Sequence, residues 1–168
     1  MSRAGFAGVT ACVLLVSGMQ VGASEPYTRA IGAETSAATV ASDSPSTLYL
    51  LHCSGCHGAD GMGERRADVP PLPPYVGNFL RDREGRLYVA NVGGVVSSGL
   101  NATDTAVVLN WVMERFGGPS LPNGVAKFDA AEIRALREQR KADSVALRRT
   151  IASRLKKQGL KLADYPWP

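Results

Sequence analysis

The sequence predicts an all-α fold, in which one helical domain is followed by two further helices. Helix start signals recur along the chain, and Ser44, Asn101 and Asp129 each have a residue type that favours the helix N-cap. Apolar residues follow at helical spacing, for example at every fourth position from 147 to 155. The 168 residues suffice for one domain with appendages but not for two large domains.

The first 23 residues have the pattern of a secretory signal peptide. Arg3 provides a basic start, an apolar stretch covers residues 5–22, and the sequence up to Ala23 resembles a cleavage site. Because the apolar stretch is short and interrupted by polar residues, we expect cleavage after Ala23 rather than a stable membrane anchor. Cys12 lies in a loose match to a lipoprotein cleavage box, but cleavage there would leave too little apolar sequence ahead of it. The mature chain therefore retains two of the three cysteines.

A flexible leader is predicted between the signal peptide and the first helix. Residues 24–43 are rich in Ala, Ser and Thr and show no sustained helical or alternating pattern. The main helical domain then covers residues 44–117, and its elements follow from capping residues, glycines and prolines. We expect a helix over 45–56, a loop over 58–72, a short helix over 75–80, a helix over 85–92, a flexible loop over 93–99 and a helix from Asn101 to about Phe116.

The C-terminal extension, residues 118–168, is predicted to form two basic helices. They begin at Asp129 and near Asp143, and we expect both to pack on the preceding domain rather than build a second core. The extension carries 11 Lys and Arg against 5 Asp and Glu, whereas residues 24–117 carry 7 against 10. A basic face would attract an acidic protein partner, although an ordinary solvated helix pair would have the same composition. Nucleic acid is not an expected partner, because aromatic residues are not interleaved with the basic ones. The basic residues concerned are Arg137, Arg140, Lys141, Arg148, Arg149, Arg154, Lys156 and Lys157.

One short motif near the start of the domain carries recognisable chemistry: Cys53-Ser54-Gly55-Cys56-His57. The Cys-x-x-Cys-His pattern is the attachment signature of a c-type haem. Each thiol can form a thioether with a former vinyl group of the porphyrin, and one turn of helix presents the imidazole to the iron. The motif predicts one covalently bound haem c.

Two other uses of a Cys-x-x-Cys motif fit this chain less well. A thiol–disulfide site belongs between a strand and a helix of a βαβ unit, and no such unit precedes Cys53. A structural zinc ion takes four ligands, but the mature chain has only two cysteines and two histidines. His52 also directly adjoins Cys53, which is poor geometry for binding the same metal ion.

The motif and the helices around it resemble those of a small monohaem c-type cytochrome, similar to class I. The resemblance covers residues 44–117, and the segments 109–116 and 130–137 are similar to a small group of periplasmic cytochromes. It implies a periplasmic protein that carries single electrons and is not itself an enzyme, although it would also suit a subunit of an oxidoreductase. The implied partner is a redox protein, for example a periplasmic dehydrogenase, from which electrons pass to a terminal acceptor.

The resemblance also implies roles for individual residues. Cys53 and Cys56 would hold the haem through thioethers, and His57 would be the proximal ligand of the iron. In these cytochromes a proline about a dozen residues after the His accepts a hydrogen bond from its ring, and Pro71 is the candidate here, although it would serve equally well to stiffen a loop. Trp111 resembles the aromatic residue of the last helix that packs on the first helix.

The sequence departs from this family at the second axial ligand of the iron. Many of these cytochromes carry a Met in the loop before the last helix, but residues 92–100 contain neither Met nor His. Only Met62 and Met113 remain as candidates in the mature chain, and His52 should point away from the distal side. If neither Met binds, the iron keeps an open or weakly ligated position. The alternative function is then a haem sensor or gas-binding protein.

A third function, that of a small haem peroxidase, fits the sequence less well. Such an enzyme needs an acid–base group beside the distal face of the haem. No His is available for this role, and Arg81, Arg83 or Arg86 would have to serve.

Overall fold

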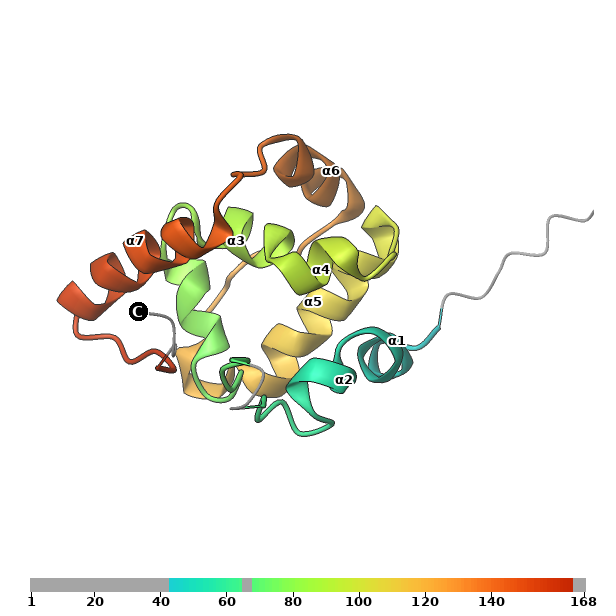
Figure 1. Ribbon diagram of the computed structural model, residues 1–168, viewed down its shortest axis with the longest axis horizontal. Coiled ribbons are helices and arrows are strands. Elements are labelled where there is room, and N and C mark those ends of the chain that lie inside the picture. The colour runs from blue at the N-terminus through green and yellow to red at the C-terminus, as the bar shows by residue number, and fades with distance from the viewer. Residues whose placement is uncertain (1–42, 65–67, 165–168) are drawn as a thin grey trace, which may run out of the picture. The chain divides into compact units, whose positions relative to one another are not determined.

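Helices make up most of the described chain, which covers residues 43–64 and 68–164 of a computed structural model. No strand forms within these ranges, so the predicted all-α class is confirmed for them, and none of the helices is both long and apolar enough to cross a bilayer. The predicted signal peptide, the leader up to residue 42 and residues 165–168 lie outside the described residues. In chain order the helices are α1 Pro45–His52, α2 Ser54–His57, the 3-10 helix η3 Val76–Arg81, α3 Gly85–Asn91, α4 Gly93–Ser97, α5 Ala102–Phe116, the 3-10 helix η4 Gly118–Ser120, α6 Ala130–Glu138 and α7 Ser144–Lys157 (Figure 1).

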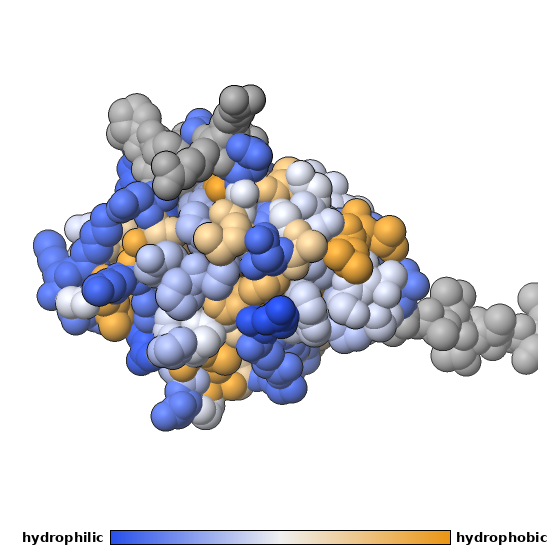
Figure 2. Space-filling model, turned by 90° about the horizontal axis from the view of Figure 1, so that it is seen from below, coloured by the Kyte–Doolittle hydropathy of each residue, from blue (hydrophilic) through white to orange (hydrophobic). Residues whose placement is uncertain are grey.

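The packing of α1 against α5 forms one side of the core (Figure 1). The Tyr49 ring lies 5.0 Å from the Trp111 ring and 5.3 Å from the Phe116 ring, measured between centroids. The predicted contact of Trp111 with the first helix is therefore confirmed. The buried side of α1 is formed by Leu48 and Tyr49, whereas Leu50 and Leu51 are 54% and 67% exposed. An apolar patch is visible at this end of the molecule (Figure 2).

The first helix ends earlier than predicted, and the haem-type motif forms a helix of its own. The backbone of Cys53 departs from helical geometry, with φ −126° and ψ −36°, and separates α1 from α2. The Ser54 hydroxyl donates a hydrogen bond to the Leu50 carbonyl at 2.7 Å, a side-chain bond that competes with regular helix pairing. The single helix expected over residues 45–56 is thus two, and the motif is oriented separately from α1.

The segment after α3 is a short helix, α4, where the sequence predicts a flexible loop. Gly93 and Gly94 lower helix propensity, which is the basis of that prediction. Tertiary contact overrides it, because Val95 packs against the core, and the Ser97 hydroxyl donates to the Gly93 carbonyl at 2.9 Å. The neighbouring prediction over residues 85–92 is confirmed by α3.

The C-terminal extension shares the core of the preceding domain. Ile133 of α6 and Ile151 and Leu155 of α7 are fully buried, and they belong to the same cluster as Leu48 of α1. In Figure 1, α6 lies over α3 and α5, while α7 lies beside α3 and η3. The expectation that both helices pack on the domain without a second core is confirmed for the described residues.

Several basic residues of the extension fix it to the domain instead of forming an open basic face. Arg154 donates to both oxygens of Asp82, at 2.6 and 2.7 Å, and to Glu84 at 2.9 Å. Arg137 donates to the Leu100 carbonyl at 3.1 Å, and Arg148 is buried with 7% exposure. The exposed basic face therefore contains fewer residues than predicted, because these three arginines make contacts inside the fold. The exposed members are Arg140, Lys141, Arg149, Lys156 and Lys157.

Candidate cofactor site

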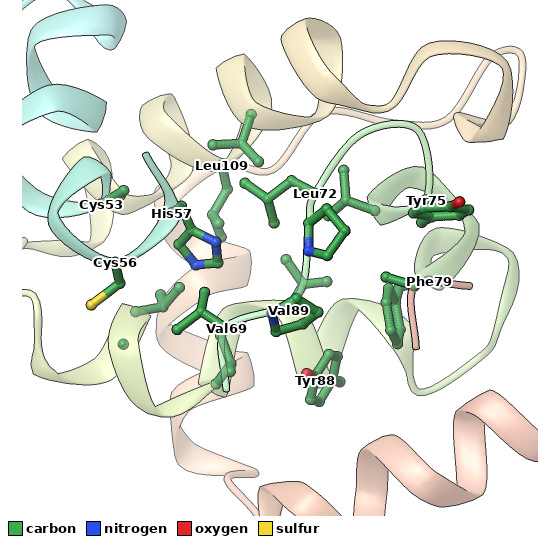
Figure 3. A pocket seen from close by; sticks show the side chains of 18 of the residues that line it. Cys53, Cys56, His57, Val69, Leu72, Tyr75, Phe79, Tyr88, Val89 and Leu109 are labelled. Carbon is green, nitrogen blue, oxygen red and sulfur yellow. The ribbon is translucent and has the colours of Figure 1, made fainter. Parts of the chain in front are cut away.

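An apolar cavity of about 300 Å³ lies beside α2, and most of the predicted site residues meet there. Its wall is mainly aliphatic and aromatic and is built from several helices and the loop between α2 and η3 (Figure 3). Cys53, Cys56 and His57 all line it, as do Pro71 and Met113. A volume of this size is at the lower end of the range for small-molecule and cofactor sites, about 300 to 1,000 Å³.

The His57 side chain projects into this cavity from the end of α2 (Figure 3). Burial lowers the pKa of the imidazole, which favours the neutral form that binds metals. Nδ1 is buried and has no hydrogen-bond partner, so the bond predicted to the Pro71 carbonyl is absent from this structure. The Pro71 loop is held through the main chain instead, because the Leu72 N–H donates to the Gly61 carbonyl at 2.8 Å. A buried nitrogen without a hydrogen-bond partner is unusual in a folded protein.

The two thiols are free and border the same cavity. Cys53 is half-buried and packs against the core, whereas Cys56 is exposed. Burial raises the pKa of Cys53, and the neighbouring Cys56 adds to this effect. A thiol–disulfide site needs a thiol whose pKa is lowered, so the environment of Cys53 disfavours that use of the motif.

No zinc-type cluster accompanies the motif. Within residues 43–64 and 68–164, no group of three or more His, Cys, Asp or Glu side chains is arranged to hold a metal ion. The His52 ring lies on the surface, where its Nδ1 is 3.0 Å from the Ser98 carbonyl oxygen, and it does not line the cavity. The environment of His52 therefore agrees with the expectation that it takes no part in the site.

The core positions the motif through Tyr49. Its hydroxyl donates a 2.6 Å hydrogen bond to the carbonyl of Gly58, the residue after His57. Burial is the main reason why the pKa of Tyr49 is raised to about 12, with smaller contributions from Cys53 and Asp60. Because the Tyr49 ring also packs on α5, this hydrogen bond connects the end of α2 to α5 through Tyr49.

The two candidate methionines lie in different environments. Met113 is 3% exposed and lines the same cavity as His57. Met62 is 55% exposed and borders a neighbouring groove instead of the cavity. The structure therefore separates the two candidates, which the sequence treats as equal, and retains Met113.

The three arginines that a peroxidase would require do not line the cavity. Arg86 forms an ion pair with Glu132, and its guanidinium carbon lies 3.9 Å from the centre of the Phe128 ring. Arg81 and Arg83 are exposed, and Arg81 donates to the Asn78 side chain at 3.2 Å. No observation on these residues favours peroxidase chemistry.

The C-terminal extension contributes two residues to the cavity wall, which sequence reasoning missed. They are Arg148 of α7 and Ala163, which lies beyond its end. The predicted stripe is confirmed, because Ile151 and Leu155 are fully buried and Leu147 packs, partly buried, against the core. Arg148 is buried beside this stripe, which the sequence pattern did not predict. The spacing 148, 151, 155 also fits one helix face, and this signal could have identified Arg148.

Comparisons with models of protein families and with curated proteins found no match. The residues themselves are compatible with a covalently attached haem. Two reduced thiols and an imidazole with an unpartnered buried nitrogen border one largely apolar cavity. This donor set is the one by which a c-type haem is held.

Proposed function

We propose that this protein is a c-type cytochrome of the periplasm that carries one electron at a time. The observation that supports this most strongly is the meeting of Cys53, Cys56 and His57 at a single apolar cavity. A fold resembling that of class I cytochromes is part of the proposal, as is export through the N-terminal segment. The protein acts as a carrier rather than an enzyme.

Each residue of the motif has a separate task in this function. Cys53 and Cys56 would hold a haem covalently, each through one thioether to a former vinyl group of the porphyrin. His57 offers a neutral imidazole to the iron, since burial keeps its pKa low. When bound, the haem supplies an iron that alternates between the ferric and ferrous states.

The surrounding residues control solvent access and partner choice. Val89, Leu109 and Val112 of the apolar wall are buried and keep water from the cavity. The partner is a redox protein such as a periplasmic dehydrogenase. The exposed Arg149, Lys156 and Lys157 favour an acidic surface on that partner.

A haem sensor or gas-binding protein is the second candidate, and the wall of the cavity supports it. Among the described residues of that wall, Met113 is the only one with a sulfur other than the two cysteines, and no second His is present. If Met113 does not bind iron, the iron keeps a position for a small molecule. Met113→Leu conserves volume and should cost less than about 1.5 kcal/mol, so a spectral change would report ligation rather than unfolding.

An optical spectrum of the purified, dithionite-reduced protein, before and after carbon monoxide, tests both candidates. The carrier predicts a sharp low-spin spectrum that carbon monoxide leaves unchanged, and the sensor predicts a high-spin spectrum that shifts at once. Met113→Leu should turn the first result into the second, whereas Met62→Leu, the matched control, should change neither. Covalent attachment is tested by denaturing the protein and measuring whether the haem absorbance stays with the chain. If the wild type then shows no more haem absorbance than the Cys53→Ala, Cys56→Ala double variant, the haem proposal is wrong.

A further inference from the structure

The C-terminal extension introduces a buried cation into the wall of the candidate haem cavity. Arg148 of α7 is 7% exposed, and it is the only Lys or Arg among the described residues that line the cavity. The same residue borders a groove of about 570 Å³ on the outer side, whose wall includes the exposed Arg149. Arg148 therefore stands between the apolar cavity and a basic surface.

Two contacts locate the guanidinium of Arg148 at the cavity wall itself. Its central carbon lies 5.5 Å from the centre of the Phe79 ring, and its Nη2 donates to the Ala163 carbonyl at 3.3 Å. Phe79 and Ala163 both line the cavity as well. On its cavity side, the charged end of the side chain is thus bounded by a largely apolar wall, in which Asp68 is the acidic residue among those described.

The position of Arg148 is fixed by the rest of α7. Asp143 caps the helix by accepting from the Ala146 N–H at 2.8 Å, and Ile151 and Leu155 are fully buried in the core. Near the end of α7, Arg154 is bound to Asp82 of the domain. A helix held at its start, middle and end presents Arg148 to the cavity with little freedom to move away.

We propose that Arg148 binds a carboxylate of the cofactor, so that the extension completes the haem site. The inference rests on the proposed function, because haem carries two propionate carboxylates. A guanidinium donates two parallel N–H bonds to one carboxylate, and the contact is strong where few polar groups surround it. Arg148 would then be a positioning residue, which orients the porphyrin ring and offsets the negative charge of the carboxylate.

The proposal has a consequence for the reduction potential. A cation near the haem favours the ferrous state, because reduction removes one positive charge from the iron. Replacing Arg148 with a neutral residue removes this cation and leaves the carboxylate charge uncompensated. This loss of one positive charge lowers the midpoint potential of the haem.

Redox titration of the haem-loaded protein tests the proposal with three variants. Arg148→Gln should lower the midpoint potential, and the propionate bending band in the resonance Raman spectrum should move. Arg148→Lys should keep the potential near that of the wild type but still move the Raman band, since a lysine retains the charge without the paired geometry. Arg149→Gln is the matched control, because it removes the same charge one position along α7 from an exposed side chain that solvent screens.

The outcomes separate this inference from the function on which it rests. Wild-type protein without covalent haem would defeat the proposed function. Covalent haem with equal potentials in Arg148→Gln and Arg149→Gln, and an unmoved Raman band, would overturn the role of Arg148 alone. If Arg148→Gln fails to fold, Arg148→Lys decides the question: an unchanged band rejects the contact, and a shifted band supports it.

Discussion

Helices α2 and α7 both border the cavity, but they differ in how much of each is buried in the core. Helix α2 has four residues, Cys56 on it is exposed, and a side chain added at Gly55 would meet open space. Helix α7 has 14 residues, and Ile151 and Leu155 on it are fully buried. The exposed Cys56 thiol thus lies on an open segment, whereas Arg148 of the cavity wall belongs to a helix fixed in the core.

This difference suits a protein whose cofactor is attached covalently. A large planar molecule has to reach the thiols, and the open position of Cys56 allows this. Stability then has to come from elsewhere, and the extension supplies part of it. We therefore expect substitutions in α7 to affect mainly folding, and substitutions in α2 to affect mainly cofactor binding.

Leu155→Ala should reduce stability more than any other single substitution that probes this difference. Leu155 is fully buried, and loss of its side chain leaves a cavity that costs about 2 to 5 kcal/mol of unfolding free energy. Urea denaturation followed by far-UV circular dichroism measures this cost.

Leu51→Ala provides the control, because it makes the same chemical change near the C-terminal end of a helix in the other region. Leu51 is 67% exposed, so Leu51→Ala should change the free energy of unfolding of the protein by less than about 0.5 kcal/mol. Equal losses for the two variants would contradict the division of labour between α1–α2 and the extension.

Arg154→Gln should have the next largest effect, because it breaks the contact between α7 and the domain. The Asp82 side chain is only 4% exposed, so removal of its partner leaves a buried carboxylate without charge compensation. The midpoint of thermal unfolding should fall by a few degrees at neutral pH.

The effect of Arg154→Gln should depend on pH in a defined direction. The hydrogen bond from Arg154 lowers the pKa of Asp82, so the contact stabilises the fold above the ordinary carboxyl pKa of 3.8 and loses this effect as the pH falls through the lowered value. The gap between variant and wild type should therefore be widest near neutral pH and shrink below about pH 4. A gap that stays constant down to pH 2 would show that Arg154 stabilises the fold by packing alone.

Sequence reasoning identified the parts of the molecule that depend on local patterns. The N-caps at Ser44, Asn101 and Asp129 form the predicted bonds, each to the N–H three residues later. The positions of Cys53 and His57 at a common cavity also follow from local spacing, because both lie within one short segment.

The features that sequence reasoning missed depend on contacts between distant segments. The helix over Gly93–Ser97 forms against glycine propensity because Val95 reaches the core. Arg148 reaches the cavity because α7 packs so that position 148 is buried as well as the apolar stripe beside it. For Val95 the local propensity of two glycines points the other way, and for Arg148 the only local signal is a helical spacing that its charge argues against.

Tyr49→Phe should have a smaller effect than Leu155→Ala and Arg154→Gln, and it tests how firmly α2 is held. The variant keeps the ring packing on α5 but loses the 2.6 Å hydrogen bond to the Gly58 carbonyl, which should cost about 1 kcal/mol.

Tyr49→Phe should also change how the free energy of unfolding depends on pH above pH 10. Because burial raises the Tyr49 pKa from 10.0 to about 12, the wild type loses stability as the pH rises from 10 to 12, where the unfolded chain ionises first. Tyr49→Phe should show a smaller loss in that interval, measured by denaturation at pH 8, 10 and 11, and an equal loss would mean that Tyr49 is accessible to solvent and does not hold α2.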